Sequence, residues 1–252
     1  MLLEVDIDSP VATLTFNDPE RHNTLSAEMF TALRSALDLI ESEYKGAVVR
    51  VRGNGPSFCS GLDLDACSQD RKTLDHFLTE LSVTARRLRR MPKVVVAEVH
   101  GNALAGGCAL LSACDIVCAE PDARFGYPVL RLGLSPAVSV PTLLDAIGPS
   151  QATALMLSEK IIDGYEAYRI GLAHQLAQSA ETLDALTNDL CTAISKKGPH
   201  ALATTKAWIN TICGCDNDEP FEKTLDASME SGRTEEAHEL LTTFWNRRKT
   251  ND

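Results

Sequence analysis

The first half of the chain alternates short apolar runs with amphipathic segments, and this alternation constrains the fold more than any other feature. Four runs are rich in β-branched and other apolar residues, as strands are; they are residues 11–16, 47–51, 93–99 and 115–119. Between them apolar residues recur at helical spacing, first in a segment that Ser26 can cap. Strands alternating with helices favour right-handed β-α-β crossovers, so we expect an α/β fold.

The second half of the chain has the pattern of helices. Helical spacing recurs in residues 151–157, 163–171, 180–196, 201–212 and 235–248, and no strand-like run of comparable quality follows Ser150. Gly198 and Pro199 mark a break that divides the chain into an α/β core, residues 1–197, and a helical region, residues 198–252. We expect the apolar residues of this region to cover the core or a neighbouring subunit; they are Phe221, Leu225, Met229, Leu240, Leu241, Phe244 and Trp245.

Composition and charge exclude several classes of protein. The 252 residues are 44% hydrophobic and 23% charged, which is typical of a globular chain and not of a disordered one. The net charge of −11 argues against nucleic acid or an anionic membrane as partner, because both require a basic face. The start has no basic segment followed by an apolar one, and no apolar run reaches the roughly 20 residues that span a bilayer, so we expect a cytoplasmic protein.

Eight cysteines raise the question of disulfides or a metal site. In a large chain without an export signal, we expect them to be reduced and mostly buried. Cys114 and Cys118 form one close pair, and Cys213 and Cys215 form another, but neither pair has a second pair or histidines at ligand spacing. We therefore predict no metal site.

Two glycine-containing segments are candidates for a functional site, because each follows a predicted strand. They are residues 57–64 and residues 100–108, and the second opens a predicted helix. Glycine lets a ligand approach the backbone, and a helix N-terminus offers unpaired N–H groups. Either segment alone is more typical of tight packing. Together they can form an oxyanion hole, a pair of N–H groups that binds a negatively charged oxygen.

Five segments carry a resemblance that runs over nearly the whole chain. They are residues 11–25, residues 58–64, residues 99–108 with the following Cys-Asp-Ile, residues 125–136 and residues 244–249. In this order they resemble the motifs of the enoyl-CoA hydratase/isomerase (crotonase) family. The resemblance implies a spiral of repeated β-β-α units with a C-terminal helical region. It also implies an acyl-CoA thioester as substrate, with coenzyme A as part of the substrate and no other cofactor.

The resemblance assigns roles to particular residues. It implies that the backbone N–H groups of Ser60 and Gly106 hold the thioester oxygen. It places along the substrate the residues Arg21, His22, Cys59, Gly61, Leu62, Asp63, Gly107, Ala109 and Val129. It further implies homotrimers or hexamers whose C-terminal helices lie over an active site. The resemblance allows contacts with coenzyme A at the end of the last predicted helix, from Trp245, Arg247, Arg248 and Lys249. A solvated basic helix end is an equally good interpretation of these residues.

The chain departs from the family at its acid–base positions. Hydratases of the family carry glutamates where this chain has Ala109 and Val129, and some isomerases carry a base where it has Ala137. An alkyl side chain cannot transfer a proton, and general acid–base catalysis is worth about 10²- to 10⁴-fold per group. The polar candidates that remain near the implied pocket are Tyr127, Ser135, Ser139, Cys108, His76 and Asp63.

Each of these candidates also has a structural interpretation. Asp63 is placed to cap the next helix, Cys108 to pack as a small apolar residue and His76 to lie on a solvated helix face. Glu98, in a predicted strand, needs a buried partner. Tyr127 is the catalytic candidate to test first, although a packing role is favoured for it.

Three functions stay open at this point. The first is an enzyme of the hydratase or isomerase type that passes through a thioester enolate. The second is decarboxylation of a malonyl-type thioester, in which loss of carbon dioxide generates the enolate without a base. The third is a protein that binds coenzyme A thioesters without turnover.

Overall fold

The computed structural model describes residues 1–69 and 71–249. The side chains of residues 68, 69, 71 and 245–249 are not described. The predicted coenzyme A contacts of Trp245, Arg247, Arg248 and Lys249 therefore lie outside the described side chains.

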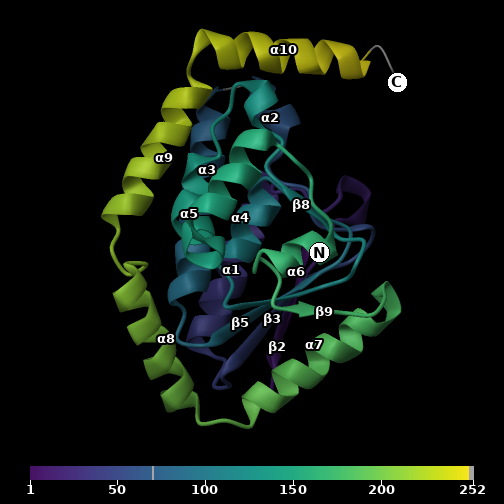
Figure 1. The fold of residues 1–252 in the computed structure, drawn as a ribbon, viewed down its shortest axis with the longest axis vertical. Coiled ribbons are helices and arrows are strands. Elements are labelled where there is room, and N and C mark those ends of the chain that lie inside the picture. The colour runs from purple at the N-terminus through teal and green to yellow at the C-terminus, as the bar shows by residue number, and fades with distance from the viewer. Residues whose placement is uncertain (70, 250–252) are drawn as a thin grey trace.

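The strands form two sheets (Figure 1). The six-stranded sheet has the order β1-β2-β3-β5-β7-β9 and consists of β1 (Leu3–Asp6), β2 (Ala12–Phe16), β3 (Val48–Gly53), β5 (Val94–Val99), β7 (Ile116–Ala119) and β9 (Gln175–Leu176). Only the β1–β2 pair is antiparallel. The parallel three-stranded sheet consists of β4 (Ser57–Cys59), β6 (Asn102–Leu104) and β8 (Arg124–Gly126).

Ten α-helices and three short 3-10 helices are present in the described residues. The α-helices are α1 (Ala27–Ser42), α2 (Leu64–Gln69), α3 (Arg71–Arg90), α4 (Gly106–Ser112), α5 (Val140–Ser158), α6 (Gly164–Arg169), α7 (Ala180–Ser195), α8 (Pro199–Cys213), α9 (Glu219–Gly232) and α10 (Glu235–Lys249). The 3-10 helices are η1 (Pro19–Arg21), η2 (Leu130–Leu132) and η3 (Ala137–Ser139). Ser26 caps α1 as predicted, because its hydroxyl accepts the Met29 N–H at 3.2 Å.

Chain order confirms the predicted spiral of β-β-α units. Three times, a strand of the large sheet is followed by a strand of the small sheet and then by helices: β3 by β4, β5 by β6, and β7 by β8. The four predicted strands are present as β2, β3, β5 and β7, and the short strands of the second sheet were not predicted. This arrangement brings the chain segments that leave β4, β6 and β8 to one place.

The main core lies between the sheets and helices α1, α3, α4 and α5, whereas α7 covers the other face of the large sheet. Glu98 has the partner that its burial demands, since it forms an ion pair with Arg50. Seven of the eight cysteines are buried, Cys213 is exposed, and all eight are free thiols.

The C-terminal helices run along one side of the core and across one end of it (Figure 1). Helix α9 packs on α3 and η3, and α10 packs on η2 and α9. Phe221 of α9 is 2% exposed and Leu241 of α10 is 8% exposed, so part of the predicted cover is within the chain itself. The predicted boundary at residues 197 and 198 falls in the loop between α7 and α8. No helix among the described residues combines the length and apolar character needed to span a membrane.

Candidate active site

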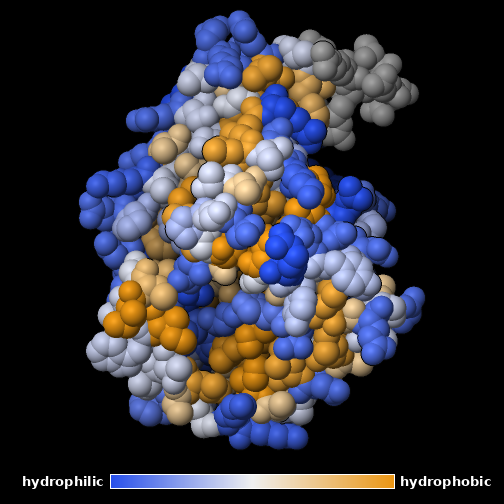
Figure 2. Space-filling model, viewed as in Figure 1, coloured by the Kyte–Doolittle hydropathy of each residue, from blue (hydrophilic) through white to orange (hydrophobic). Residues whose placement is uncertain are grey.

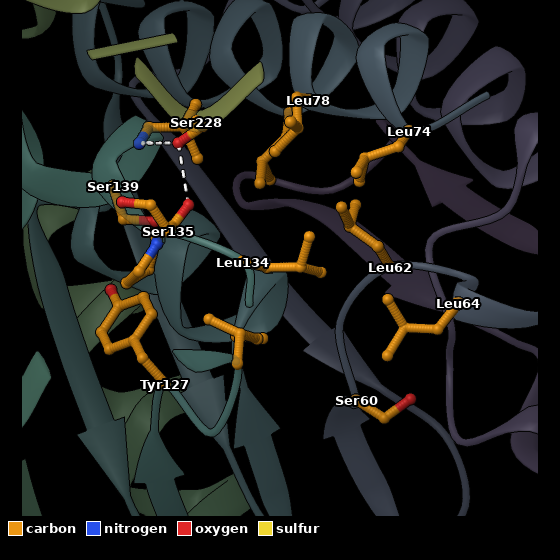
Figure 3. Close-up of a pocket in the computed structure, with 16 residues that line it drawn as sticks. Ser60, Leu62, Leu64, Leu74, Leu78, Tyr127, Leu134, Ser135, Ser139 and Ser228 are labelled. Carbon is orange, nitrogen blue, oxygen red and sulfur yellow. Dashed lines mark hydrogen bonds between the residues drawn. The ribbon is translucent and has the colours of Figure 1, made fainter. Parts of the chain in front are cut away.

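A cavity of about 70 Å³ lies where the β4–α2 connection, α3, the start of α4, the β8–η3 segment and α9 meet. Its walls are mainly apolar and include Leu62, Leu64, Leu74, Leu78, Leu81, Val129, Leu134 and Val138. Hydroxyl-bearing residues border it as well; these are Ser60, Tyr127, Ser135, Ser139 and Ser228. Figure 3 shows Ser60, Leu62 and Leu64 on one side and Tyr127, Ser135 and Ser139 on the other.

The two glycine-containing segments meet at this cavity. A Cβ atom added to Gly61, which has φ +102°, would lie 3.3 Å from the Gly106 nitrogen. A Cβ atom added to Gly106 would lie 3.5 Å from the Leu62 nitrogen. The N–H groups of Leu62 and Gly106 are therefore neighbours, and both residues border the cavity.

The hydrogen bonds of the first segment identify which of its N–H groups is free. The Ser60 N–H donates to the His22 carbonyl at 3.1 Å. The Leu25 N–H donates to the Gly61 carbonyl at 2.8 Å, and the Asp63 N–H donates to the Leu25 carbonyl at 3.2 Å. Leu62 lies between these two bonds, and its N–H has no acceptor among the described residues. The fold thus already uses the Ser60 N–H that was predicted as a donor, whereas the Leu62 N–H is left available.

Gly106 is the first residue of α4, so its N–H has no acceptor within the helix. No other described residue accepts it. Ala105, which precedes it, has φ 48° and ψ −111°, a conformation that residues with a Cβ atom rarely adopt. Gly107 has a packing role, because a Cβ atom there would lie 2.2 Å from the carbonyl oxygen of Cys59. Cys59 itself is fully buried in β4.

The residues predicted to contact coenzyme A lie beside Ser60. Arg21 and His22 are exposed, and the Thr24 hydroxyl is 2.9 Å from the Ser60 hydroxyl. Asp63 accepts the Ala66 N–H at 3.2 Å, which confirms that it caps α2, and it pairs with Arg21 at 2.5 Å. The Arg21–Asp63 pair therefore orders an exposed segment next to the cavity.

The positions of the family's carboxylates differ in their access to the cavity. Val129 borders it. Ala109 is 1% exposed and packs in the core, and Ala137, in η3, is not among the lining residues. Of the described residues that line the cavity, Tyr127 alone is ionisable. His76 is exposed on α3 as predicted, and Cys108 is fully buried.

Tyr127 occupies the far side of the cavity from Leu62. Its side chain is fully buried, and burial raises the pKa of its hydroxyl well above the usual range. The phenol is therefore protonated at neutral pH. Among the described residues no group of three or more metal-ligating side chains comes together.

Ser228 of α9 is a cavity residue that the sequence did not indicate. Its hydroxyl accepts the Val138 N–H at 2.8 Å and donates to the Ser135 carbonyl at 2.9 Å (Figure 3). Ser231, three residues later, similarly accepts the Ser135 N–H at 3.0 Å. Two serines on one face of an otherwise amphipathic helix were the only sequence signal for this contact.

The sequence profile of the enoyl-CoA hydratase/isomerase family matches residues 6–251. The chain belongs to this family. It is 29% identical over 246 residues to the short-chain-enoyl-CoA hydratase of Clostridium acetobutylicum, covering 96% of this chain and 94% of that one. It is also 29% identical to the crotonyl-CoA hydratase of Syntrophomonas wolfei, covering 97% and 95% of the two chains. The crystal structure of an enoyl-CoA hydratase from Mycobacterium avium superposes with a TM-score of 0.85 at 28% identity, covering 98% and 96%.

Proposed function

We propose that this member of the enoyl-CoA hydratase/isomerase family binds an acyl-CoA thioester with the carbonyl oxygen between the N–H groups of Leu62 and Gly106. The observation that carries this proposal is that these two N–H groups are neighbours at the cavity and have no acceptor among the described residues. Two preorganised donors stabilise the negative charge that an enolate places on the oxygen, and one such donor is typically worth about 3–4 kcal/mol.

Proton transfer in this cavity does not come from a carboxylate. The alkyl side chain of Val129 borders the space where a substrate would react, and Tyr127 is held in its protonated form. We therefore expect coenzyme A thioesters to bind while hydration of crotonyl-CoA is slow or absent. Binding depends on backbone groups that are present, whereas hydration depends on side chains that are not.

The test is to compare crotonyl-CoA turnover by the natural protein with turnover by Val129→Glu, because Val129 borders the cavity and Ala109 packs in the core. We expect a measurable gain in the variant, because a restored acid–base group can contribute about 10²-fold or more. The matched control is Val129→Gln, which has the same size and cannot titrate. Calorimetric binding of a non-reactive acyl-CoA to each variant separates binding from chemistry. A natural protein that hydrates crotonyl-CoA with kcat around 10 s⁻¹ would contradict the proposal.

Decarboxylation of a malonyl-type thioester is the second candidate. It is favoured by the apolar lining, because a substrate carboxylate placed there has no cation among the described lining residues to stabilise it. The carbon–carbon bond electrons pass to the thioester enolate as carbon dioxide leaves, so no base is needed, and the α-carbon of the enolate then takes a proton from solvent. Incubation with methylmalonyl-CoA and detection of propionyl-CoA tests it. Binding without turnover of either substrate would leave the third function, a binding protein.

A further inference from the structure

The proposed oxyanion donor Leu62 lies in the connection between β4 and α2, so its direction depends on the backbone beside it. Residues 22–25 run parallel to residues 60–63, with a bridge between Leu25 and Leu62. Leu25 bonds to the residues on either side of Leu62, so the Leu62 N–H points away from residues 22–25. The position of this N–H therefore depends on how firmly residues 22–25 are held.

The start of this segment has a backbone conformation that needs support from side chains. His22 has φ 53° and Asn23 has φ 55°, in the left-handed region that residues with a Cβ atom adopt at a cost. Asn23 is fully buried, and its side-chain amide bonds to three backbone groups. The His22 carbonyl accepts the Ser60 N–H at 3.1 Å. The turn at residues 22 and 23 thus fixes the end of the pairing that lies nearest to Ser60.

The His22 ring is bonded to a buried hydroxyl. Its Nδ1 lies 3.0 Å from the Oγ of Ser57, the first residue of β4, and Ser57 is 0% exposed. The Asn102 side chain of β6 donates to the same Oγ at 3.3 Å. The Ser57 hydroxyl has one hydrogen to donate, and His22 Nδ1 is the acceptor that the described residues offer it. The neutral imidazole with an unprotonated Nδ1 therefore completes this buried network.

We propose that His22 is a positioning residue for the thioester carbonyl: its bond to the Ser57 hydroxyl holds the turn at residues 22 and 23, and this turn holds the Leu62 N–H in the oxyanion hole. The inference rests on the proposed function, because it takes the carbonyl oxygen to bind at Leu62. The described lining residues of the cavity include neither His22 nor Ser57, so both act through the backbone. A hydrogen-bond donor is effective only while it is held within about 0.5 Å of its productive position, so a loose turn weakens recognition of the carbonyl.

The experiment compares calorimetric dissociation constants for butyryl-CoA and S-butyl-CoA, a thioether in which a CH₂ group replaces the carbonyl. Their ratio reports recognition of the carbonyl, because contacts with the coenzyme A portion contribute equally to both ligands. We expect the natural protein to prefer the thioester by about tenfold or more, the range of two hydrogen bonds. Ser57→Ala and His22→Ala should each lower this preference by about three- to tenfold. Combining them should lower it no further, because both remove the same bond.

Three further variants separate this bond from other effects of substitution. His22→Asn keeps an acceptor at the place of Nδ1 and tolerates the left-handed region, so it should keep the preference. His22→Gly adopts φ 53° without strain but has no acceptor, so it should lose the preference as His22→Ala does. Thr187→Val is the matched control for loss of a fully buried hydroxyl, which here bonds within α7, and it should keep the preference.

The outcomes distinguish this inference from the proposed function. A full preference in Ser57→Ala and His22→Gly would overturn the inference and leave the proposed function intact. The same holds if the variants lose affinity equally for thioester and thioether, or if His22→Asn behaves as His22→Ala does. Because His22 is exposed, its variants decide the question even if Ser57→Ala does not fold. A natural protein that binds both ligands equally, or neither, contradicts the proposed function, and the inference fails with it.

Discussion

Gly106 and Gly107 are adjacent but have different structural roles, so we expect alanine to have different effects at the two positions. In Gly106→Ala the new methyl group lies 3.5 Å from the Leu62 nitrogen, in front of the proposed oxyanion hole, and its nearest contact is the flexible end of Leu25 at 3.0 Å. We expect this variant to fold, with a loss of stability of about 1 kcal/mol. Its turnover of any thioester substrate should fall by about 10²-fold or more. Circular dichroism and a kinetic assay measure the two effects.

Gly107→Ala is the matched control. Its methyl group would lie 2.2 Å from the backbone oxygen of Cys59, the last residue of β4, and this backbone atom cannot move as a side chain can. We expect a loss of more than about 4 kcal/mol, seen as an insoluble or unfolded product. A Gly106→Ala variant with full activity would show that the thioester oxygen binds elsewhere.

Ala105 provides a second prediction for a single residue. Its φ of 48° and ψ of −111° are strained for a residue with a Cβ atom, and strain of this kind costs about 1–3 kcal/mol. Glycine adopts the conformation freely but loses more backbone entropy on folding, which offsets part of the gain. We expect Ala105→Gly to raise the free energy of unfolding by about 1 kcal/mol in urea titrations. Ala103→Gly, in the neighbouring strand β6, is the control and should lower it.

The sequence located the segment of the proposed oxyanion hole, but not which of its N–H groups is left without an acceptor. Glycine and strand order placed residues 57–64 beside residues 100–108, and the structure brings them together at the cavity. Which N–H group is free depends on hydrogen bonds with His22 and Leu25, which are distant in sequence. The His22 carbonyl accepts the Ser60 N–H, and Leu25 bonds to the Gly61 carbonyl and the Asp63 N–H. This hydrogen-bond register depends on the folded backbone, and the side chains of the segment do not indicate it. Ser60 was chosen for its place beside Gly61, whereas the hydrogen bonds favour Leu62.

Among the elements, long apolar runs were predictable and short strands were not. The strands β2, β3, β5 and β7 bury nearly every residue and so are rich in apolar and β-branched residues, although β3 contains Arg50 and Arg52 and β5 contains Glu98. By contrast, β4, β6 and β8 have three residues each, too few for a period of two to appear. These short strands deliver Ser60, Gly106 and Tyr127 to the cavity. The elements that position the candidate site are therefore the ones with the weakest sequence signal.

Helix α9 supports the cavity wall through Ser228. Removing this hydroxyl in Ser228→Ala leaves the Val138 N–H and the Ser135 carbonyl without partners, at a cost of about 1–3 kcal/mol for each buried group. We expect the free energy of unfolding to fall by about 2–4 kcal/mol and the affinity for acyl-CoA to fall with it, because η3 borders the cavity. Chemical denaturation and calorimetry measure both.

Thr224→Ala is the control for this helix. Among the described residues, the Thr224 hydroxyl bonds only to the Pro220 and Phe221 carbonyls of its own helix. Its loss should therefore cost less than about 1 kcal/mol and leave binding unchanged. Equal effects of the two substitutions would mean that α9 does not hold the wall through Ser228.

At the scale of the whole molecule, the helical region is part of the same folded unit as the core. Lys206 of α8 is 6% exposed and donates to the carbonyls of Leu88 and Lys93 and to the Asp115 carboxylate. Burial lowers the pKa of Lys206, and the Asp115 carboxylate opposes that effect. Removal of one partner of a buried ion pair typically costs about 3–5 kcal/mol, so the tail and core should unfold together. The boundary read from Gly198 and Pro199 falls between two helices, α7 and α8, and we expect no separate unfolding transition on either side of it.

Association of this chain into trimers or hexamers stays a prediction, but the exposed apolar residues on which it depends differ from those expected from the sequence. Phe221, expected to need a neighbouring subunit, is buried within its own chain. Three of the exposed large apolar side chains lie together on α8: Trp208 is 63% exposed, Ile209 50% and Ile212 81%. Figure 2 shows apolar residues gathered over α8 on the face in view. Trp208 and Ile212 are one helical turn apart, so they form a continuous surface of the kind that interfaces cover.

We expect light scattering to give a mass that is a multiple of three times 27.3 kDa. Trp208→Lys/Ile212→Lys should lower that mass, because two charges at the centre of an apolar interface would be buried without partners. Leu157→Lys is the matched control, since Leu157 of α5 is 69% exposed and equally apolar. It should leave the mass unchanged if association depends on α8 and not on exposed leucine in general. A natural protein that is monomeric at micromolar concentration contradicts the prediction, and a double variant that keeps the full mass places the interface elsewhere.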